Sequence, residues 1–144
     1  MQKHKPCRFA KVEIQQEEIG QYMSTPVISI DANANIKELS EQMESKNIGS
    51  LLVKEKEEFV CIITERDITQ KIIGKGMDPN TTKVSEIVSS TICGLQGNEA
   101  ATKANMFMAE KRVRHLAVTD GGKIIRMLSV KDLVSFFANP RLRY

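Results

Sequence analysis

The chain contains one short stretch twice, first as Val60-Cys-Ile-Ile-Thr-Glu-Arg-Asp67 and again as Ile125-Arg-Met-Leu-Ser-Val-Lys-Asp132. Each copy has four mostly apolar residues, a hydroxyl residue, and an aspartate three positions later. An apolar run of strand length that ends at Thr or Ser predicts a buried strand passing directly into a helix. Thr64 and Ser129 are then expected at the helix N-cap, where backbone N–H groups lack partners within the helix. We expect any ligand to bind near these two helix starts.

The repetition extends over most of the chain at a constant offset of 65 residues, the spacing of Asp67 and Asp132. Shared apolar positions with few shared surface residues are expected of two diverged copies of one folding unit. Two such units can bury their apolar faces against each other, which predicts one pseudo-symmetric module. The apolar positions that coincide are Ile19/Val84, Val27/Ile92, Ile30/Leu95, Met43/Met108, Leu51/Leu116, Val53/Val118, Ile63/Leu128 and Ile68/Leu133.

Composition indicates an ordinary soluble protein with one core. The chain has 144 residues, of which 41% are hydrophobic and 27% charged, with a net charge of +3. The mild basic excess gathers partly in the tails and forms no dense basic stripe with aromatic residues, so we do not expect nucleic-acid binding. Association of nucleic acid with the basic tail 1–17 is the weakest of three hypotheses.

Location and redox state follow from what the sequence contains. The longest apolar stretches, such as 59–63, are far shorter than a membrane span, and the N-terminus lacks the apolar segment of a secretory signal. The three cysteines have no paired spacing. We therefore expect a reduced, cytoplasmic protein with no membrane association and no metal site.

Periodicity predicts the same order of elements in both halves, strand–helix–strand–strand–helix, and hence an α/β (α+β) fold with short mixed sheets. A first short strand, 9–14, and a helical turn, 19–23, are expected near the N-terminus. The expected strands are 27–30, 50–53, 59–63, 92–93, 116–118 and 123–128, and the expected helices are 35–45, 67–73, 99–110 and 131–138. The predicted organisation is a tail (1–18), a first repeat (19–74), a linker (75–83), a second repeat (84–138) and a tail (139–144).

Several motifs recur in order in the two halves. The first half carries Met23-Ser-Thr-Pro-Val27, Gly49-Ser-Leu-Leu-Val53 and Ile62-Ile-Thr-Glu-Arg-Asp67; the second carries Arg114-His-Leu-Ala-Val118, Asp120-Gly-Gly122 and Leu128-Ser-Val-Lys-Asp132. Over about residues 19–138 the chain resembles a tandem pair of CBS domains, the unit called a Bateman module.

That resemblance implies two βαββα repeats around a pseudo-twofold axis, with two clefts between them. It also implies a regulatory role without catalysis. Such modules often bind an adenosine-containing ligand in the clefts (AMP, ADP, ATP or S-adenosylmethionine), need no obligatory cofactor, form homodimers and signal to a partner protein.

The residue types at the repeated junctions suit such a ligand. A carboxylate one turn into a helix can accept two hydrogen bonds from a ribose diol, and a hydroxyl at the N-cap favours a nearby phosphate oxygen. Thr64 with Asp67, and Ser129 with Asp132, are therefore candidate nucleoside sites. The alternative is that Thr-x-x-Asp resembles a capping box that only satisfies its own helix end.

Arg114 and His115 are candidates for neutralising a phosphate, and their counterparts Gly49 and Ser50 are uncharged. By the resemblance, the basic pair faces the cleft shared with Thr64 and Asp67. We therefore expect that cleft to take a phosphorylated ligand and the Asp132 cleft to take a less charged one. The alternative is a solvated basic patch with His115 in a packing role.

The resemblance also assigns residues that flank an adenine ring, although each of them is equally an ordinary strand-entry residue: Thr25, Pro26, Val27, Thr91 and Ile92. The chain departs from the family at two positions, where Cys61 and Arg126 stand in place of glycine. Because Arg126 is large, it is expected either to fill the second cleft or to reach a phosphate.

No combination of nucleophile, base and orienting group is present in the sequence, so we expect a protein that is not an enzyme. The leading hypothesis is a sensor of an adenosyl ligand. The alternative, of a different class, is a constitutive dimerisation or interaction scaffold without a small-molecule ligand.

Overall fold

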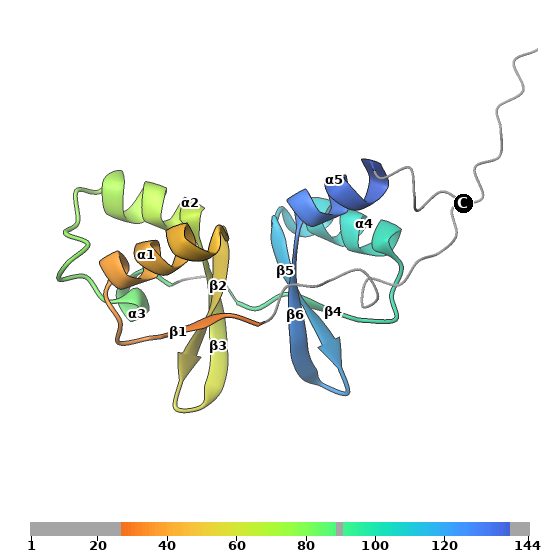
Figure 1. The fold of residues 1–144 in the computed structure, drawn as a ribbon, viewed down its shortest axis with the longest axis horizontal. Helices are drawn as coiled ribbons and strands as arrows, with labels where there is room; N and C mark the ends of the chain where they lie inside the picture. Colours follow the sequence, from red (N-terminus) through yellow and green to blue (C-terminus); the bar gives the residue numbers. More distant parts are fainter. Residues whose placement is uncertain (1–26, 89–90, 139–144) are drawn as a thin grey trace, which may run out of the picture.

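The computed structural model describes residues 27–88 and 91–138. Along these residues each half has the predicted order of elements and forms its own three-stranded sheet (Figure 1). The first half contains β1 (Ser29–Asp31), α1 (Ile36–Lys46), β2 (Ser50–Glu55), β3 (Glu58–Thr64), α2 (Glu65–Asp67) and η1 (Ile68–Ile73). The second contains α3 (Val84–Ile87), β4 (Gly94–Gln96), α4 (Ala101–Lys111), β5 (His115–Asp120), β6 (Lys123–Ser129) and α5 (Val130–Ala138).

Both sheets are mixed, as predicted. The first strand is parallel to the second, and the second is antiparallel to the third. The first strands begin two residues later than predicted, at Ser29 and Gly94. The residues before them, Ile28 and Cys93, contribute only a carbonyl to the neighbouring strand, because hydrogen bonds in a parallel pair are slanted.

The offset of 65 residues holds for the backbone as well as for the sequence. Each hairpin shifts register at the same place, between Val53 and Lys54 and again between Val118 and Thr119. Both long helices end at a residue in the left-handed conformation, Asn47 with φ 50° and Arg112 with φ 54°. The two halves are therefore structural duplicates.

The predicted apolar stripe of α1 is confirmed. Ile36, Leu39 and Met43 are buried against Leu51 of β2 and Ile63 of β3. The same arrangement recurs in the second half, where α4 covers β5 and β6, and the corresponding buried residues are Ala101, Ala104, Met108, Leu116 and Leu128.

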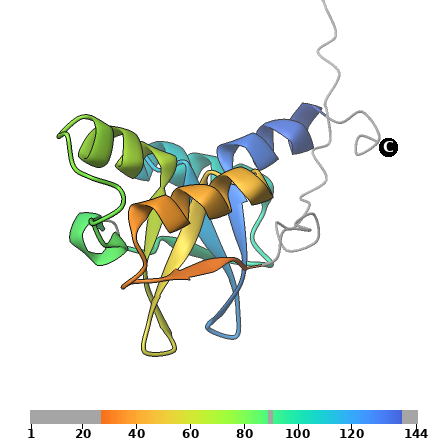
Figure 2. The ribbon, with the colours of Figure 1, turned by 60° about the vertical axis from the view of Figure 1, so that its left-hand side comes forward.

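The opposite faces of the two central strands are buried as well. Leu52 and Ala117 are fully buried, yet neither belongs to the core beneath its own helices. Successive side chains of a strand point to opposite faces, and Figure 1 shows β2 and β5 next to each other with the helices on the outer sides. We conclude that the two sheets bury these faces against one another, which joins the repeats into one module; Figure 2 shows both hairpins extending from the same side.

The closing segment of the first repeat differs from the predicted regular helix 67–73. A short α-helical start at Glu65 continues as the π-helix η1, which ends with a hydrogen bond of 2.9 Å from the Gly74 N–H to the Thr69 carbonyl. A Cβ at Gly74 would lie 2.6 Å from the Gln70 carbonyl oxygen, so the wide turn requires glycine here.

Helix α3 precedes the second sheet but packs on the first repeat. Val84 and Ile87 are buried in the core of α1 and β2. The Val84 N–H donates to the Ala34 carbonyl at 2.8 Å, and the Ser85 N–H to the Ala32 carbonyl at 2.9 Å. The segment that connects the repeats is thus part of the first core.

The strand expected at 9–14 and the helical turn expected at 19–23 lie outside the described residues. Within the described ranges, the helices are all too short or too polar to cross a membrane.

Replacing Leu51 by alanine is expected to lower the free energy of unfolding by about 2–5 kcal/mol, because it leaves a cavity in a fully buried site. Urea unfolding followed by circular dichroism measures this. Met106→Ala on α4 is the control, since Met106 is 63% exposed, and it should change stability by less than about 0.5 kcal/mol. Equal losses in the two variants would contradict this account of the core.

Candidate functional site

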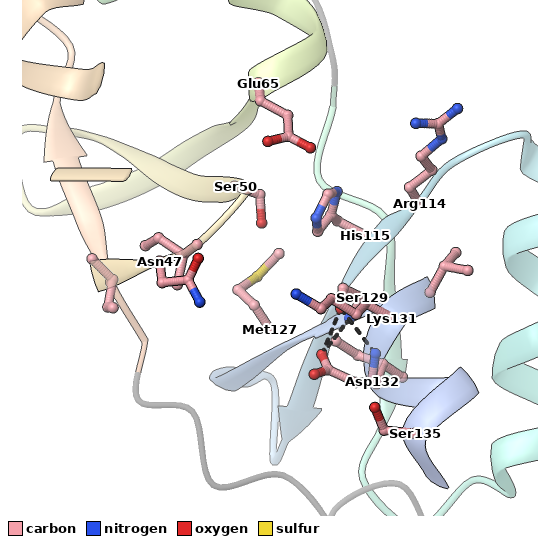
Figure 3. Close-up of a pocket in the computed structure, with 15 residues that line it drawn as sticks. Asn47, Ser50, Glu65, Arg114, His115, Met127, Ser129, Lys131, Asp132 and Ser135 are labelled. Carbon is pink, nitrogen blue, oxygen red and sulfur yellow. Dashed lines mark hydrogen bonds between the residues drawn. The ribbon is translucent and has the colours of Figure 1, made fainter. Parts of the chain in front are cut away.

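A cavity of about 450 Å³ lies between the two repeats, within the size range of small-molecule sites. Its walls come from the start of β2 and α2 on one side, and from β5, β6 and the first turns of α5 on the other (Figure 3). The apolar lining residues include Ile28, Ile48 and Met127. The polar lining residues are Asn47, Ser50, Glu65, Arg114, His115, Ser129, Lys131, Asp132 and Ser135.

Strand register explains why these side chains converge. His115 pairs with Ser129, and Ala117 pairs with Met127. Paired residues share one face of a sheet, so His115, Ser129 and Met127 lie on the face of Ala117, which is turned toward the other repeat. Ser50 lies on the equivalent face of β2, two residues before Leu52.

The start of α5 has a capping arrangement that leaves one carboxylate oxygen available. Oδ2 of Asp132 accepts hydrogen bonds from the Ser129 N–H and the Ser129 hydroxyl, both at 2.8 Å. The Asp132 N–H in turn donates to the Ser129 Oγ at 3.1 Å. Among the described residues, Oδ1 of Asp132 takes part in no hydrogen bond or ion pair. Capping and ligand binding are therefore compatible at this aspartate.

The equivalent junction of the first repeat is engaged differently. Oδ2 of Asp67 accepts from the Thr64 N–H at 3.0 Å and from the Thr64 hydroxyl at 3.2 Å. Its Oδ1 forms an ion pair of 3.0 Å with the Nζ of Lys71, which also donates to the Ile87 carbonyl. Neither Thr64 nor Asp67 lines the cavity.

Charges of both signs surround the cavity. Arg114 and Lys131 carry positive charge, and Glu65 and Asp132 carry negative charge. Burial lowers the pKa of the His115 imidazole; the positive charge of Arg114 adds to this effect, and the carboxylates of Glu65 and Asp132 oppose it. In Figure 3 the Glu65 carboxylate points toward Ser50 and His115, and the Arg114 guanidinium points away from Asp132.

The structure groups the candidate residues differently from the sequence-based prediction. Arg114 and His115 line the cavity together with Ser129 and Asp132. The expectation that this basic pair would leave the Asp132 cleft the less charged of the two is therefore wrong. The reason is geometric, since His115 is paired with Ser129 across the β5–β6 ladder and so shares its face.

Other candidates lie apart from the cavity. Val27, Thr91 and Ile92 do not line it, and Thr25 and Pro26 lie outside the described residues. Arg126 does not fill the cavity either, because it pairs with Val118 on the opposite face of the sheet.

The sequence reasoning missed several lining residues: Asn47, Glu65, Met127 and Lys131. The repeat offset was the signal for some of them. Asn47 is the counterpart of Arg112, two residues before Arg114, so the segment that enters β2 was a candidate once the segment that enters β5 had been chosen. Over the described residues, no group of His, Cys, Asp or Glu side chains could hold a metal ion.

Comparison with known proteins identifies the architecture. The family model described as "CBS domain" matches residues 19–74 and again residues 81–139. The chain belongs to the CBS-domain family. Proteins of this family are generally regulatory and not catalytic.

Individual relatives of this CBS-domain pair agree with the family match. Protein MK0525 of Methanopyrus kandleri is 28% identical over 118 residues, which are 81% of this chain and 60% of that protein, so this chain spans well under the full length of that relative. A protein with CBS domains from Burkholderia ambifaria is 28% identical, with a TM-score of 0.79 over 85% of this chain and 94% of that one.

A more distant structure shares the fold alone. CBS domain protein PAE2072 from Pyrobaculum aerophilum, in complex with AMP, is 18% identical, with a TM-score of 0.76 over 88% of this chain and 95% of that one.

The imidazole of His115 is expected to titrate below about pH 6.5, the ordinary value for histidine, because burial disfavours its charged form. Between the two pKa values the unfolded chain binds more protons than the folded one. The stability that this group contributes is therefore fully present above the unfolded value and is lost as the pH falls toward the folded value.

An NMR titration of the imidazole resonances measures the pKa directly. The chain has two histidines, and the spectrum of a His4→Gln variant assigns the resonance of His115. A midpoint at or above 6.5 in the folded protein would contradict the burial described here.

Proposed function

We propose that this CBS-domain pair is a regulatory module that binds an adenosine-containing ligand in the cavity at Asp132. The observation that carries the proposal is the unengaged Oδ1 of Asp132, while Oδ2 is held by Ser129. A carboxylate fixed in this way can accept hydrogen bonds from a ribose diol without rearranging its helix cap.

The rest of the cavity suits the other parts of such a ligand. Ile28, Ile48 and Met127 offer apolar and polarizable contacts for an adenine ring. Lys131 in the first turn of α5 provides positive charge beside the helix N-terminus, where a phosphate is favoured. The complex of PAE2072 with AMP supports an adenine nucleotide as the ligand class.

The charge distribution allows two members of that class, and these can be distinguished. Arg114, Lys131 and a protonated His115 favour the phosphates of AMP, ADP or ATP. Glu65 favours the cationic groups of S-adenosylmethionine instead. The ligand is regulatory in both cases, and no obligatory cofactor is part of the proposal.

A ligand in this cavity would contact both repeats at once, because the lining residues come from both. It would stabilise the arrangement of the repeats that it fits best and so shift the population toward that arrangement. A partner protein that distinguishes the arrangements would read the signal. A homodimeric assembly and a cytoplasmic location complete the proposal.

Isothermal titration calorimetry with AMP, ATP and S-adenosylmethionine tests the proposal. At least one of them is expected to bind, and Asp132→Asn is expected to weaken that binding by at least about tenfold, because a hydrogen bond to a charged group contributes about 1.5–3 kcal/mol. The matched control is Asp120→Asn at the exposed end of β5, which should leave the affinity within about twofold.

The alternative, a scaffold without a ligand, predicts different results. No heat would be observed with any of the three compounds at millimolar concentration. Asp132→Asn would then change only the stability of the α5 cap. That outcome would overturn the proposed sensing function.

A further inference from the structure

The two strand-to-helix junctions differ at one position on the closing helices. Four residues after Asp67 stands Lys71, and four residues after Asp132 stands Phe136. Residues four apart on a helix are neighbours, so this difference acts directly on the two aspartates. A phenyl ring cannot neutralise a carboxylate, and Phe136 instead packs against the core of the second repeat.

Lys71 is held firmly at the first junction. Its Nζ lies 3.0 Å from Oδ1 of Asp67, and the two side chains are only 23% and 13% exposed. The same ammonium group donates to the carbonyl of Ile87 at the end of α3. By contrast, the ion pair of Lys37 and Glu41 on α1 spans 3.9 Å between side chains that are more than 60% exposed, and such a pair is weak.

A ribose diol would have to compete with this lysine. Each oxygen of the Asp67 carboxylate already accepts a hydrogen bond, Oδ2 from Thr64 and Oδ1 from Lys71. A hydrogen bond from a cation to a carboxylate is about twice as strong as one between neutral groups. Displacing Lys71 would also leave the Ile87 carbonyl without this donor and would bring a buried ammonium group to a site without its counterion.

We infer that Lys71 acts as a built-in cation that closes the Asp67 junction to nucleosides, so that each chain binds one adenosyl ligand at Asp132 and none at Asp67. This inference rests on the proposed function, since it concerns how many such ligands bind and which residue decides that number. Lys71 is thus a residue that determines specificity between the two halves of a duplicated scaffold.

The number of ligands per chain tests the inference. Calorimetric titrations with AMP, ATP and S-adenosylmethionine, and native mass spectrometry of the same mixtures, are expected to give one ligand per unmodified chain. Lys71→Met removes the charge while keeping the length of the side chain, and it is expected to raise the number to two. Lys71→Arg keeps a cation beside Asp67 and is expected to remain at one.

The matched control is Lys37→Met, which removes the lysine of an exposed helical ion pair in the same repeat and should leave one ligand per chain. Thermal unfolding checks that each variant is folded; if Lys71→Met is not, Lys71→Gln replaces it.

Each outcome has a separate meaning. Two ligands on the unmodified chain would overturn the inference and leave the proposed function standing. One ligand on both the unmodified chain and a folded, uncharged Lys71 variant would show that Lys71 is not the determinant. No binding of any of the three compounds would overturn the proposed function and this inference with it.

Discussion

Strands β2 and β5 are buried on both faces, and the other features of the molecule follow from this constraint. One face of each strand is covered by its own helices, and the other is turned toward the neighbouring repeat, where Leu52 and Ala117 are fully buried. A strand buried in this way requires a nearly continuous apolar run, which both strands have. Polar side chains on the inner face are consequently confined to the strand ends, where Ser50, His115 and Ser129 meet in the cavity.

The same backbone thus supports two chemically different junctions. Both aspartates accept hydrogen bonds from the N-cap residue through Oδ2. They differ in what reaches Oδ1, a lysine at Asp67 and no described residue at Asp132. Duplication preserves strand pairing and helix capping, because the fold needs both in each half. It leaves side chains outside the core free to diverge.

Much of the fold could be predicted from the sequence, because the offset of 65 residues correlates two independent copies of the same pattern. The apolar stripe of α1, the order of the strands and the caps at Ser129 and Thr64 are local features that depend on periodicity and turn chemistry. The π-helical form of η1 was not predictable in this way. It depends on Gly74 approaching the Gln70 carbonyl, which a pattern of apolar residues does not encode.

The site was less predictable than the fold. Ser129, Asp132, Arg114 and His115 were identified, but their grouping depends on which face of β5 is turned toward the other repeat. The pair of Asp67 and Lys71 has a helical spacing that the sequence displays. Whether a lysine four residues away binds the aspartate or extends into water depends on burial and on the Ile87 carbonyl, both of which are tertiary features.

The position of α3 has a consequence for how this polypeptide can be divided. Val84 and Ile87 follow the connector in sequence, yet they complete the core beneath α1, and backbone hydrogen bonds hold them to Ala32 and Ala34. A stop codon or a proteolytic nick between Gly76 and Thr82 would therefore not release an intact first half. It would deprive that half of two interior side chains and expose the apolar surface beneath them, so the gene segment for one repeat does not coincide with a unit that can fold alone.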